Sequence, residues 1–462
     1  MNDECGMMKG GDHPQDPVDA PAQNRQATAQ PPAPAQPIHH SQFPSRREFL
    51  RQGASLVALA GTVPAFLAQT VQAAGRHSGA RALRDGEKIL VVLQLAGGND
   101  GLNTVVPVTN DAYYRARPQL ALPGRQTLKL DGDFALNGAA VDLKALYDTE
   151  HLAFVHAVGY PNPNRSHFKS MDIWHTASPE GRMHDGWLGR YFDNACGGED
   201  CDSTAGIALA EESPLAMRGE RFLPLAFERP ESLTWHAAAR PAPTGRAVTA
   251  LNQPRPLDPP QPETNLEYLR RVALEARLSA EKIQWATRDD GARGGGRNTR
   301  GGALGRDLRT VARLIAAGMQ TRVYYVSLGG FDTHANQLNR QSGLLRDLGT
   351  ALMDFFNTLK AQGDLERVLV LSFSEFGRRV AENGSRGTDH GSGSVAFLAG
   401  AAVKGGLHGT PGDLDNLDRG DVRYTTDFRS LYATVLDGWL GVRSAQILGG
   451  EFPKLDVIAR RR

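Results

Sequence analysis

The stretch KILVVLQLAGGND, residues 88–100, decides the fold class. From Ile89 to Ala96 it is almost continuously apolar and rich in branched side chains, and Gly97 and Gly98 follow at once, which predicts a strand ending in a tight turn. A strand exposed on one face would alternate apolar and polar residues, so this run indicates a strand that is buried on both faces. Such strands are typical of a parallel sheet covered by helices.

Four further stretches have the same character and the same glycine or polar ending. They are LAFVHAVGY (152–160), RVYYVSLGG (322–330), RVLVLSFSEFG (367–377) and GSVAFLAG (393–400). Amphipathic patterns with the helical period lie between or after them, at 303–318, 344–363 and 428–441. The alternation of strands and helices predicts a layered α/β fold.

The charge balance argues against binding to nucleic acid. The 462 residues include 52 Lys and Arg against 51 Asp and Glu, for a formal net charge of +1. A chain this close to neutral has no broad positive field to attract a polyanion. The Arg/Gly-rich segment 289–302 lacks interleaved aromatic residues, so we interpret it as a solvated loop.

The N-terminus carries features of an exported protein. Residues 1–44 are rich in Pro, Gln and Ala and poor in large apolar side chains, which predicts a disordered leader. In residues 45–74, Arg46 and Arg47 precede a moderately apolar stretch that ends in small residues, a pattern typical of a twin-arginine signal peptide. A membrane anchor is the alternative, but Pro64 and nearby glycines interrupt a span of about 20 residues. The pattern predicts recognition by the twin-arginine translocation machinery, cleavage that leaves no stable membrane span, and a periplasmic or exported protein.

Cys196 and Cys201 would remain after cleavage of the signal. In an oxidising compartment a local disulfide is expected, because two sulfurs alone make a poor zinc site. We assign neither cysteine a catalytic role.

The mature chain is predicted to form one α/β domain over residues 82–460. Proline-rich and glycine-rich segments interrupt it at about 229–302, with a helical pattern between them at 264–287. We interpret the interruption as an insertion, either a lid or a surface excursion.

Polar side chains gather at the carboxyl ends of the predicted strands, the edge where open α/β sheets bind ligands. By segment they are Asn99, Asp100 and Asn103; Asn164, Arg165, Ser166 and His167; Asp332 and His334; Ser374, Glu375 and Arg378; and Asp389 and His390. Mixed carboxylate and imidazole ligands are typical of divalent zinc or manganese, and magnesium is expected only if carboxylates dominate. Any one of these groups is explained as well by a turn or a helix cap. Their repetition after successive strands predicts a shared metal site.

Six motifs occur in a fixed order along the chain: VVLQLAGGNDGLNTVVP, GYPNPNRSHFKSMDIW, GWLGRY, GGFDTHANQ, SFSEFGRR and GTDHGSGS. On these motifs the sequence resembles the bacterial family called domain of unknown function 1501 (DUF1501), whose members often carry twin-arginine signals. The resemblance covers nearly all of the mature chain. That family is similar in layout to the alkaline phosphatase superfamily, which includes phosphatases, phosphodiesterases, sulfatases and phosphoglycerate mutases. The resemblance implies a three-layer α/β/α sandwich with a mostly parallel sheet and two metal ions.

The same resemblance implies roles for individual residues. One metal would be held by Asp100, Asp389 and His390, with Ser166 beside it as the nucleophile. The other would be held by Asp332, His334 and His408. Arg165 or Arg378 would bind the oxygens of the phosphate, although an ordinary salt bridge explains either arginine equally well.

Three positions leave alternatives open. One residue separates Asp332 from His334 where the phosphatase and mutase patterns have three, so His334 points either to the metal or away from it. His408 is either the third ligand or a turn residue. Glu375 is either a further ligand or a helix cap.

The predicted function is an exported metal-dependent hydrolase, a phosphatase or phosphodiesterase, that attacks phosphate esters through Ser166 and a two-metal site. The alternative is a non-catalytic periplasmic binding or assembly protein on a degenerate form of the same fold. A sulfatase is not expected, because neither Ser166 nor any cysteine stands in a C/S-x-P-x-R context. A serine hydrolase is not expected either, since the sequence has no G-x-S-x-G motif.

Overall fold

A computed structural model describes residues 88–197, 202–233, 278–288 and 300–459. All of them belong to one structural unit, residues 54–462. The predicted leader, the predicted signal peptide and Cys201 lie outside the described residues, as does most of the predicted insertion.

The five strands predicted from the sequence all lie in one sheet. Its described strands have the order β11-β5-β10-β9-β1-β8-β6-β7, with β12 also paired to β5. Their bounds are β1 Ile89–Ala96, β5 Leu152–Gly159, β6 Gly206–Ala208, β7 Leu225–Ala226, β8 Val323–Gly329, β9 Val368–Phe373, β10 Ser394–Ala399, β11 Gly406–His408 and β12 Thr426–Asp427. The central strand β1 is parallel to both β8 and β9, whereas β10 is antiparallel to β9 and β5. The sheet is therefore mostly parallel, as predicted.

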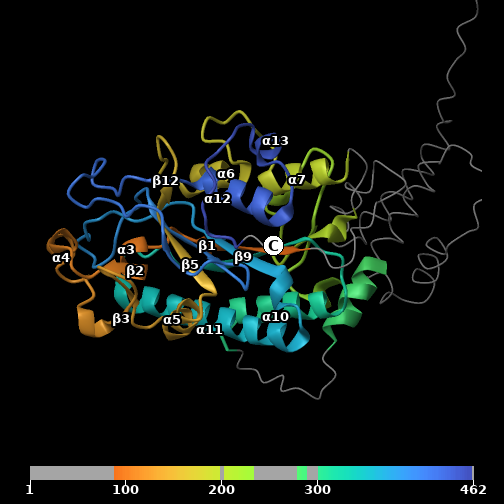
Figure 1. The fold of residues 1–462 in the computed structure, drawn as a ribbon, viewed down its shortest axis with the longest axis horizontal. Coiled ribbons are helices and arrows are strands. Elements are labelled where there is room, and N and C mark those ends of the chain that lie inside the picture. The colour runs from red at the N-terminus through yellow and green to blue at the C-terminus, as the bar shows by residue number, and fades with distance from the viewer. Residues whose placement is uncertain (1–87, 198–201, 234–277, 289–299, 460–462) are drawn as a thin grey trace, which may run out of the picture. The chain divides into compact units, whose positions relative to one another are not determined.

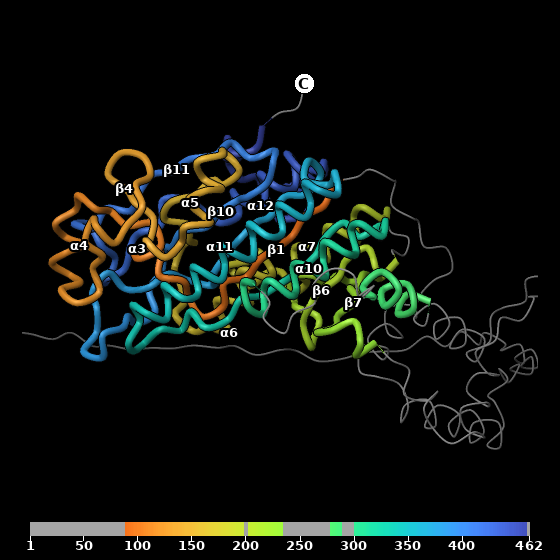
Figure 2. Tube along the Cα trace, turned by 90° about the horizontal axis from the view of Figure 1, so that it is seen from below, coloured from red at the N-terminus to blue at the C-terminus, as the bar shows by residue number. Residues whose placement is uncertain are grey.

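Helices cover both faces of this sheet (Figure 1). One face carries α6 His167–Thr176, α7 Trp187–Ala195, α12 Phe428–Val435 and α13 Ser444–Leu448, and the other carries α5 Val141–Asp148, α10 Gly302–Ala316 and α11 Gln337–Gln362. Figure 2, turned by 90°, shows α10 and α11 running side by side along the sheet.

The side chains of β1 explain why both faces are covered. Val91 and Leu93 belong to the hydrophobic core that includes α10 and α11, and Leu90 and Val92 belong to the core that includes α6 and α12. All four are almost completely buried, which is what the unbroken apolar run in the sequence requires. The three-layer α/β/α sandwich is confirmed.

A small second sheet lies beside the first and consists of β2 Val105–Pro107, β4 Phe134–Asn137 and β3 Thr127–Lys129, all antiparallel. Two short helices, α3 Gly101–Thr104 and α4 Asp111–Ala116, adjoin it in the chain. Among the described residues, no helix combines the length and the apolar composition needed to cross a membrane.

Helix α11 begins seven residues before the start of the predicted pattern, at Gln337. Gln337 and Gln341 are polar but buried, because Gln337 donates a hydrogen bond to Asp100 and accepts one from Thr388, and Gln341 donates one to the backbone carbonyl of Asp100. A pattern of apolar residues cannot reveal a first turn that is buried through hydrogen bonds. The predicted helix at 428–441 also differs, since α12 ends at Val435 and the chain continues as a π-helical turn, Leu436–Leu440.

Candidate metal centre

The predicted polar segments do meet at the carboxyl edge of the sheet. They follow β1, β8 and β9, precede α6 and precede β10. Gly97 allows two of them to approach closely, because it has φ +117° and a Cβ there would lie 2.3 Å from the backbone nitrogen of Asp332. The turn after β1 therefore rests directly against the turn after β8.

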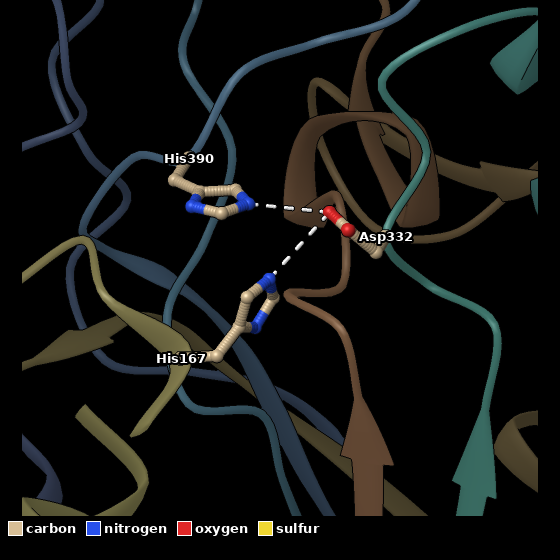
Figure 3. A group of neighbouring side chains, drawn as sticks. All are labelled: His167, Asp332 and His390. Carbon is tan, nitrogen blue, oxygen red and sulfur yellow. Dashed lines mark hydrogen bonds and ion pairs between the residues drawn. The ribbon is translucent and has the colours of Figure 1, made fainter. Parts of the chain in front are cut away.

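Three side chains from three of these segments form a cluster, shown in Figure 3. Nitrogen and oxygen atoms of His167, Asp332 and His390 lie within 4.8 Å of one another. Oδ1 of Asp332 is 3.2 Å from Nε2 of His390 and 3.7 Å from Nε2 of His167. These three side chains are therefore close enough to share a metal ion.

His334 adjoins this cluster. Its Nε2 is 2.9 Å from Nε2 of His390 and 3.1 Å from Oδ1 of Asp332. The single residue between Asp332 and His334 therefore does bring both side chains to the same place. We refer to His167, Asp332, His334 and His390 as the centre.

Outer partners orient the three imidazoles of the centre. In each ring Nδ1 faces an oxygen outside the centre: Glu375 Oε1 at 2.8 Å from His167, the Arg165 carbonyl at 2.8 Å from His390, and Asp389 Oδ1 at 3.2 Å from His334. A carbonyl or carboxylate oxygen accepts a hydrogen bond, so each Nδ1 carries a proton, and a ring that has no second proton turns the lone pair of Nε2 inward. In that form three imidazole nitrogens and one carboxylate oxygen meet as acceptors.

The pKa values favour the same protonation states. Burial raises the pKa of Asp332, but hydrogen bonds from Arg378 and His390 and the charges of Arg378 and His334 outweigh it and lower the pKa to about 2. Burial lowers the pKa of His390, and the charges of Arg378 and His167 lower it further against hydrogen bonds to Arg165 and Asp332. At neutral pH these causes favour a carboxylate and a neutral imidazole, the forms that bind metals.

Glu375 lies behind His167 and outside the centre. Its side chain is 2% exposed, and Oε1 accepts hydrogen bonds from the backbone N–H of Gly97 and from Nδ1 of His167, both at 2.8 Å. It therefore caps the turn after β1 and orients an imidazole. The sequence left two alternatives for Glu375, a metal ligand or a helix cap. The role that the structure shows is neither of them.

Arg378 is fully enclosed, with no exposed side-chain surface. Its guanidinium donates to the carbonyls of Gly97, Gly98, Phe331 and Thr388 and, at 2.7 Å, to Oδ1 of Asp332. These bonds join the turns after β1 and β8 to the loop before β10. The structure gives Arg378 a structural setting and leaves it no surface for a substrate phosphate.

Asp100 is not one of the residues of the centre and lies in a separate network of hydrogen bonds. Its carboxylate caps α3 by accepting from the N–H groups of Leu102 and Asn103, and Oδ2 also accepts from Gln337 and, at 2.6 Å, from Arg117. Both Asp100 and Arg117 are buried. The predicted grouping of Asp100 with Asp389 and His390 is therefore not what the structure brings together.

Ser166 is the N-cap residue of α6 and is exposed, and its side chain makes no capping hydrogen bond. It stands between two residues that build the centre, since His167 belongs to it and the carbonyl of Arg165 orients His390. The guanidinium of Arg165 itself bonds Asp421 through Nε at 3.0 Å and Nη2 at 2.6 Å.

His408 lies on β11, opposite Val155 of β5, and its Nε2 faces the carbonyl of Lys404 at 2.8 Å. It is not among the clustered residues. The clustered residue to which the sequence analysis assigns no role is His167, whose only signal is its position in the polar segment NRSH before α6.

A cavity of about 350 Å³ lies elsewhere, between the small sheet and the loop before β12. Phe134, His156, Ser394 and Val422 are among its lining residues, and none of the residues of the centre is. The cavity is therefore distinct from the centre.

Comparisons with known proteins find one matching family model and several solved structures of low similarity. The family model described as "Protein of unknown function (DUF1501)" matches residues 156–448, a range that contains all four residues of the centre but not Asp100. No curated protein matches this sequence.

The chain is similar to the lipoteichoic acid synthase LtaP from Listeria monocytogenes with 9% identity and a TM-score of 0.36, over 83% of this chain and 80% of that one. It is also similar to the PsFucS1 sulfatase from Pseudoalteromonas sp. (9% identity, TM-score 0.33, over 86% of this chain and 72% of that one). A third similar structure is the phosphonate monoester hydrolase of Agrobacterium radiobacter (11% identity, TM-score 0.31, over 79% and 78%). Scores this low carry no inference about activity.

Proposed function

The chain belongs to the DUF1501 family, and we propose that it is a metal-dependent hydrolase of phosphate esters in which Ser166 is the nucleophile. The metal would be held by His167, Asp332 and His390, with His334 as a fourth ligand. This replaces the expected pair of metal sites by one, because Asp100 and His408 lie outside the cluster.

The convergence of acceptors carries this proposal. Nε2 of His334 and Nε2 of His390 are 2.9 Å apart, and Oδ1 of Asp332 is within 3.2 Å of both. With every Nδ1 proton directed outward, a neutral ring presents only the lone pair of its Nε2 to the other acceptors, and these atoms repel one another unless a metal ion or a further proton lies among them. A metal ion would satisfy all of them at once, whereas Arg378, at 2.7 Å from Asp332, reaches the carboxylate but donates to neither imidazole nitrogen.

The donor set favours zinc or manganese over magnesium. Three imidazoles and one carboxylate suit a borderline transition metal, whereas magnesium prefers oxygen ligands. When bound, such an ion would polarise a phosphoryl oxygen and stabilise charge on a neighbouring oxygen.

The chain itself supplies a place for the phosphate at the start of α6. The first N–H groups of a helix have no partner within the helix, and the helix dipole is positive there. The hydroxyl of Ser166 stands at this end of α6, directly before the ligand His167. A phosphate bound here would be oriented by backbone N–H groups with the serine oxygen beside it.

Export through the twin-arginine machinery to the periplasm remains part of the proposal. Cys196 is disulfide-bonded, which supports an oxidising compartment. Fusion of residues 1–80 to a reporter that folds in the cytoplasm tests it, with Arg46→Lys/Arg47→Lys as the matched control. The reporter should reach the periplasm only with the arginine pair intact.

The alternative, a binding protein without catalysis, is favoured by one observation. Arg378, expected to bind the phosphate, has every contact directed to the protein. A binding protein would hold the metal and show no turnover.

Metal analysis and a matched pair of serine variants test the proposal. The purified mature protein should contain about one zinc or manganese per chain and hydrolyse 4-nitrophenyl phosphate or bis(4-nitrophenyl) phosphate, with 4-nitrophenyl sulfate as the comparison ester. Ser166→Ala should lower kcat by on the order of 10³-fold or more at unchanged metal content. Ser232→Ala, at an exposed serine outside the centre, should leave both unchanged. Metal-free, inactive protein would contradict the proposal, and equal turnover by Ser166→Ala would remove that residue from it.

A further inference from the structure

Two half-exposed arginines meet at a single buried carboxylate next to the centre. Arg165 and Arg379 each have 36% of the side chain exposed, whereas Asp421 has 3%. Arg165 places Nε and Nη2 at 3.0 and 2.6 Å from Oδ2 of Asp421. Nε of Arg379 approaches the other oxygen, Oδ1, at 3.9 Å.

The guanidinium of Arg379 is only loosely held. A separation of 3.9 Å is too long for a hydrogen bond, and Oδ1 of Asp421 has no hydrogen-bond partner among the described residues. The neighbouring Arg378 differs in each respect, since its guanidinium is enclosed and donates to four carbonyls and a carboxylate. Of these two adjacent arginines, Arg379 has donors to offer to a ligand.

Backbone contacts join both arginines to residues 389–390, the segment that carries His390 of the centre. The carbonyl of Arg165 accepts from Nδ1 of His390 at 2.8 Å, and the N–H of Arg379 donates to the carbonyl of Asp389 at 3.0 Å. The two arginines, whose guanidinium groups meet at Asp421, are therefore anchored beside residues 389–390, the segment that carries His390 of the centre.

Both guanidinium groups face the carboxylate of Asp421, the charge of Arg379 also lowers the pKa of the exposed Asp389, and the nearby Asp418 is paired with Arg419 at 3.5 Å. Arg379 nevertheless keeps half-exposed N–H donors, and a planar fork of such donors is suited to an anion, which it binds through two parallel hydrogen bonds.

We propose that Arg165 and Arg379 bind a second anionic group of the substrate while the centre and the start of α6 bind the phosphate that reacts. The substrate class is then a phosphate ester that carries a further phosphate or carboxylate close to the scissile one. This inference rests on the proposed function, whose reacting group it extends.

Two phosphonates that contain no phosphorus–oxygen ester bond test the inference, because a hydrolase of phosphate esters can bind them but has no ester to cleave. Methylphosphonate has one anionic group, and methylenediphosphonate has two. Calorimetric titration of the metal-loaded full chain should show methylenediphosphonate binding at least about tenfold more tightly, as expected for added charge-assisted hydrogen bonds. Arg379→Gln should reduce the ratio of the two affinities, methylenediphosphonate over methylphosphonate, to near one. Arg379→Lys should keep part of that ratio. Arg346→Gln removes an exposed arginine from α11 and should leave the ratio unchanged.

The outcomes separate the inference from the proposed function. A ratio near one in the unmodified protein, or a high ratio that survives Arg379→Gln, overturns the inference even if the metal and the esterase activity are present. A high ratio that depends on Arg379 supports it even if Ser166→Ala retains full turnover. A parallel titration with phosphonoacetate, whose second group is a carboxylate, distinguishes the two kinds of second group. Equal affinity for phosphonoacetate and methylenediphosphonate would show that the arginines accept either one.

Discussion

Asp100 and Asp332 both follow a buried strand and a pair of glycines, yet their surroundings are opposite. Asp100 is 1% exposed and its oxygens are occupied by backbone N–H groups, Gln337 and Arg117. The side chain of Asp332 is 47% exposed and faces three imidazoles and the guanidinium of Arg378. The comparison shows that a carboxylate enclosed by donors has a structural role, whereas Asp332 keeps exposed surface beside three imidazoles, where a ligand could bind.

The largest effect is expected where the buried carboxylate loses its partner. Arg117→Met should lower the free energy of unfolding by about 3–5 kcal/mol, because it leaves Asp100 charged, buried and unpaired. Arg115→Met is the matched control, since Arg115 and its partner Asp415 are exposed and 3.5 Å apart, a pairing that contributes about 0–1 kcal/mol. Urea unfolding at neutral pH measures both. Metal content should stay the same in both variants, and an equal, small loss of stability would contradict the structural role of Asp100.

The complementary variant, Asp332→Asn, should act on the metal and not on the fold. If four ligands share the binding free energy equally, losing one costs roughly 3–4 kcal/mol, or several hundred-fold in affinity. Titration against a chelator of known affinity measures it. Asp100→Asn provides the control and should bind metal like the unmodified protein while unfolding at lower urea. Loss of metal from Asp100→Asn alone would reverse the comparison.

A third prediction concerns a buried group remote from both aspartates. Burial, with a smaller contribution from the charge of Arg218, lowers the pKa of His175 to about 4. The unfolded chain titrates near pH 6.5, so between about pH 6.5 and 4 it binds more protons than the folded protein, and the free energy of unfolding falls as the pH is lowered. His175 contributes about 3 kcal/mol to that fall.

Metal-free protein should therefore lose stability between pH 7.5 and 4.5, and His175→Gln should lose about 3 kcal/mol less. His156, which burial and His408 also bring to a pKa of about 4, accounts for part of the loss that remains. Urea unfolding in the presence of a chelator measures both proteins. Identical pH dependence of the two would contradict the assignment.

The smallest effect is expected for Glu375, which contacts His167 from outside the centre. Glu375→Gln keeps the shape of the side chain but removes the carboxylate that accepts from His167, and loss of such an outer partner typically lowers metal affinity about 10–100-fold. Glu366→Gln, on the short turn before β9, is the matched control. Unchanged metal affinity in Glu375→Gln would show that Glu375 serves only the turn at Gly97.

The fold could be predicted largely from the sequence because its strands are buried on both faces. The apolar composition of stretches such as 367–377 and 393–400 identifies them as buried strands. The polar residues next to these stretches place a site at one edge of the sheet. The direction of β10 could not be read in this way, because an antiparallel strand that is covered on both faces has the same apolar run.

The roles within the site could be predicted only in part. The sequence predicts Asp332 and His334 at one metal and His390 at another, whereas the structure brings all three together. It assigns no role to His167, and Asp100 lies instead in a network with Arg117 and Gln337. The deciding contacts join residues far apart in the chain, such as Glu375 with His167 and Gln337 with Asp100. No local pattern records which donor a carboxylate will meet, or that Arg378 is enclosed while Arg379 is half-exposed.

X-ray absorption at the metal edge of the purified protein would identify the proposed ion and its ligands. We predict one first-row divalent ion per chain with imidazole nitrogens and one carboxylate oxygen at about 2.0–2.2 Å, and the loss of one imidazole from that shell in His167→Phe. An ion surrounded by oxygens alone, a shell that is unchanged in His167→Phe, or protein that takes up no metal would contradict it.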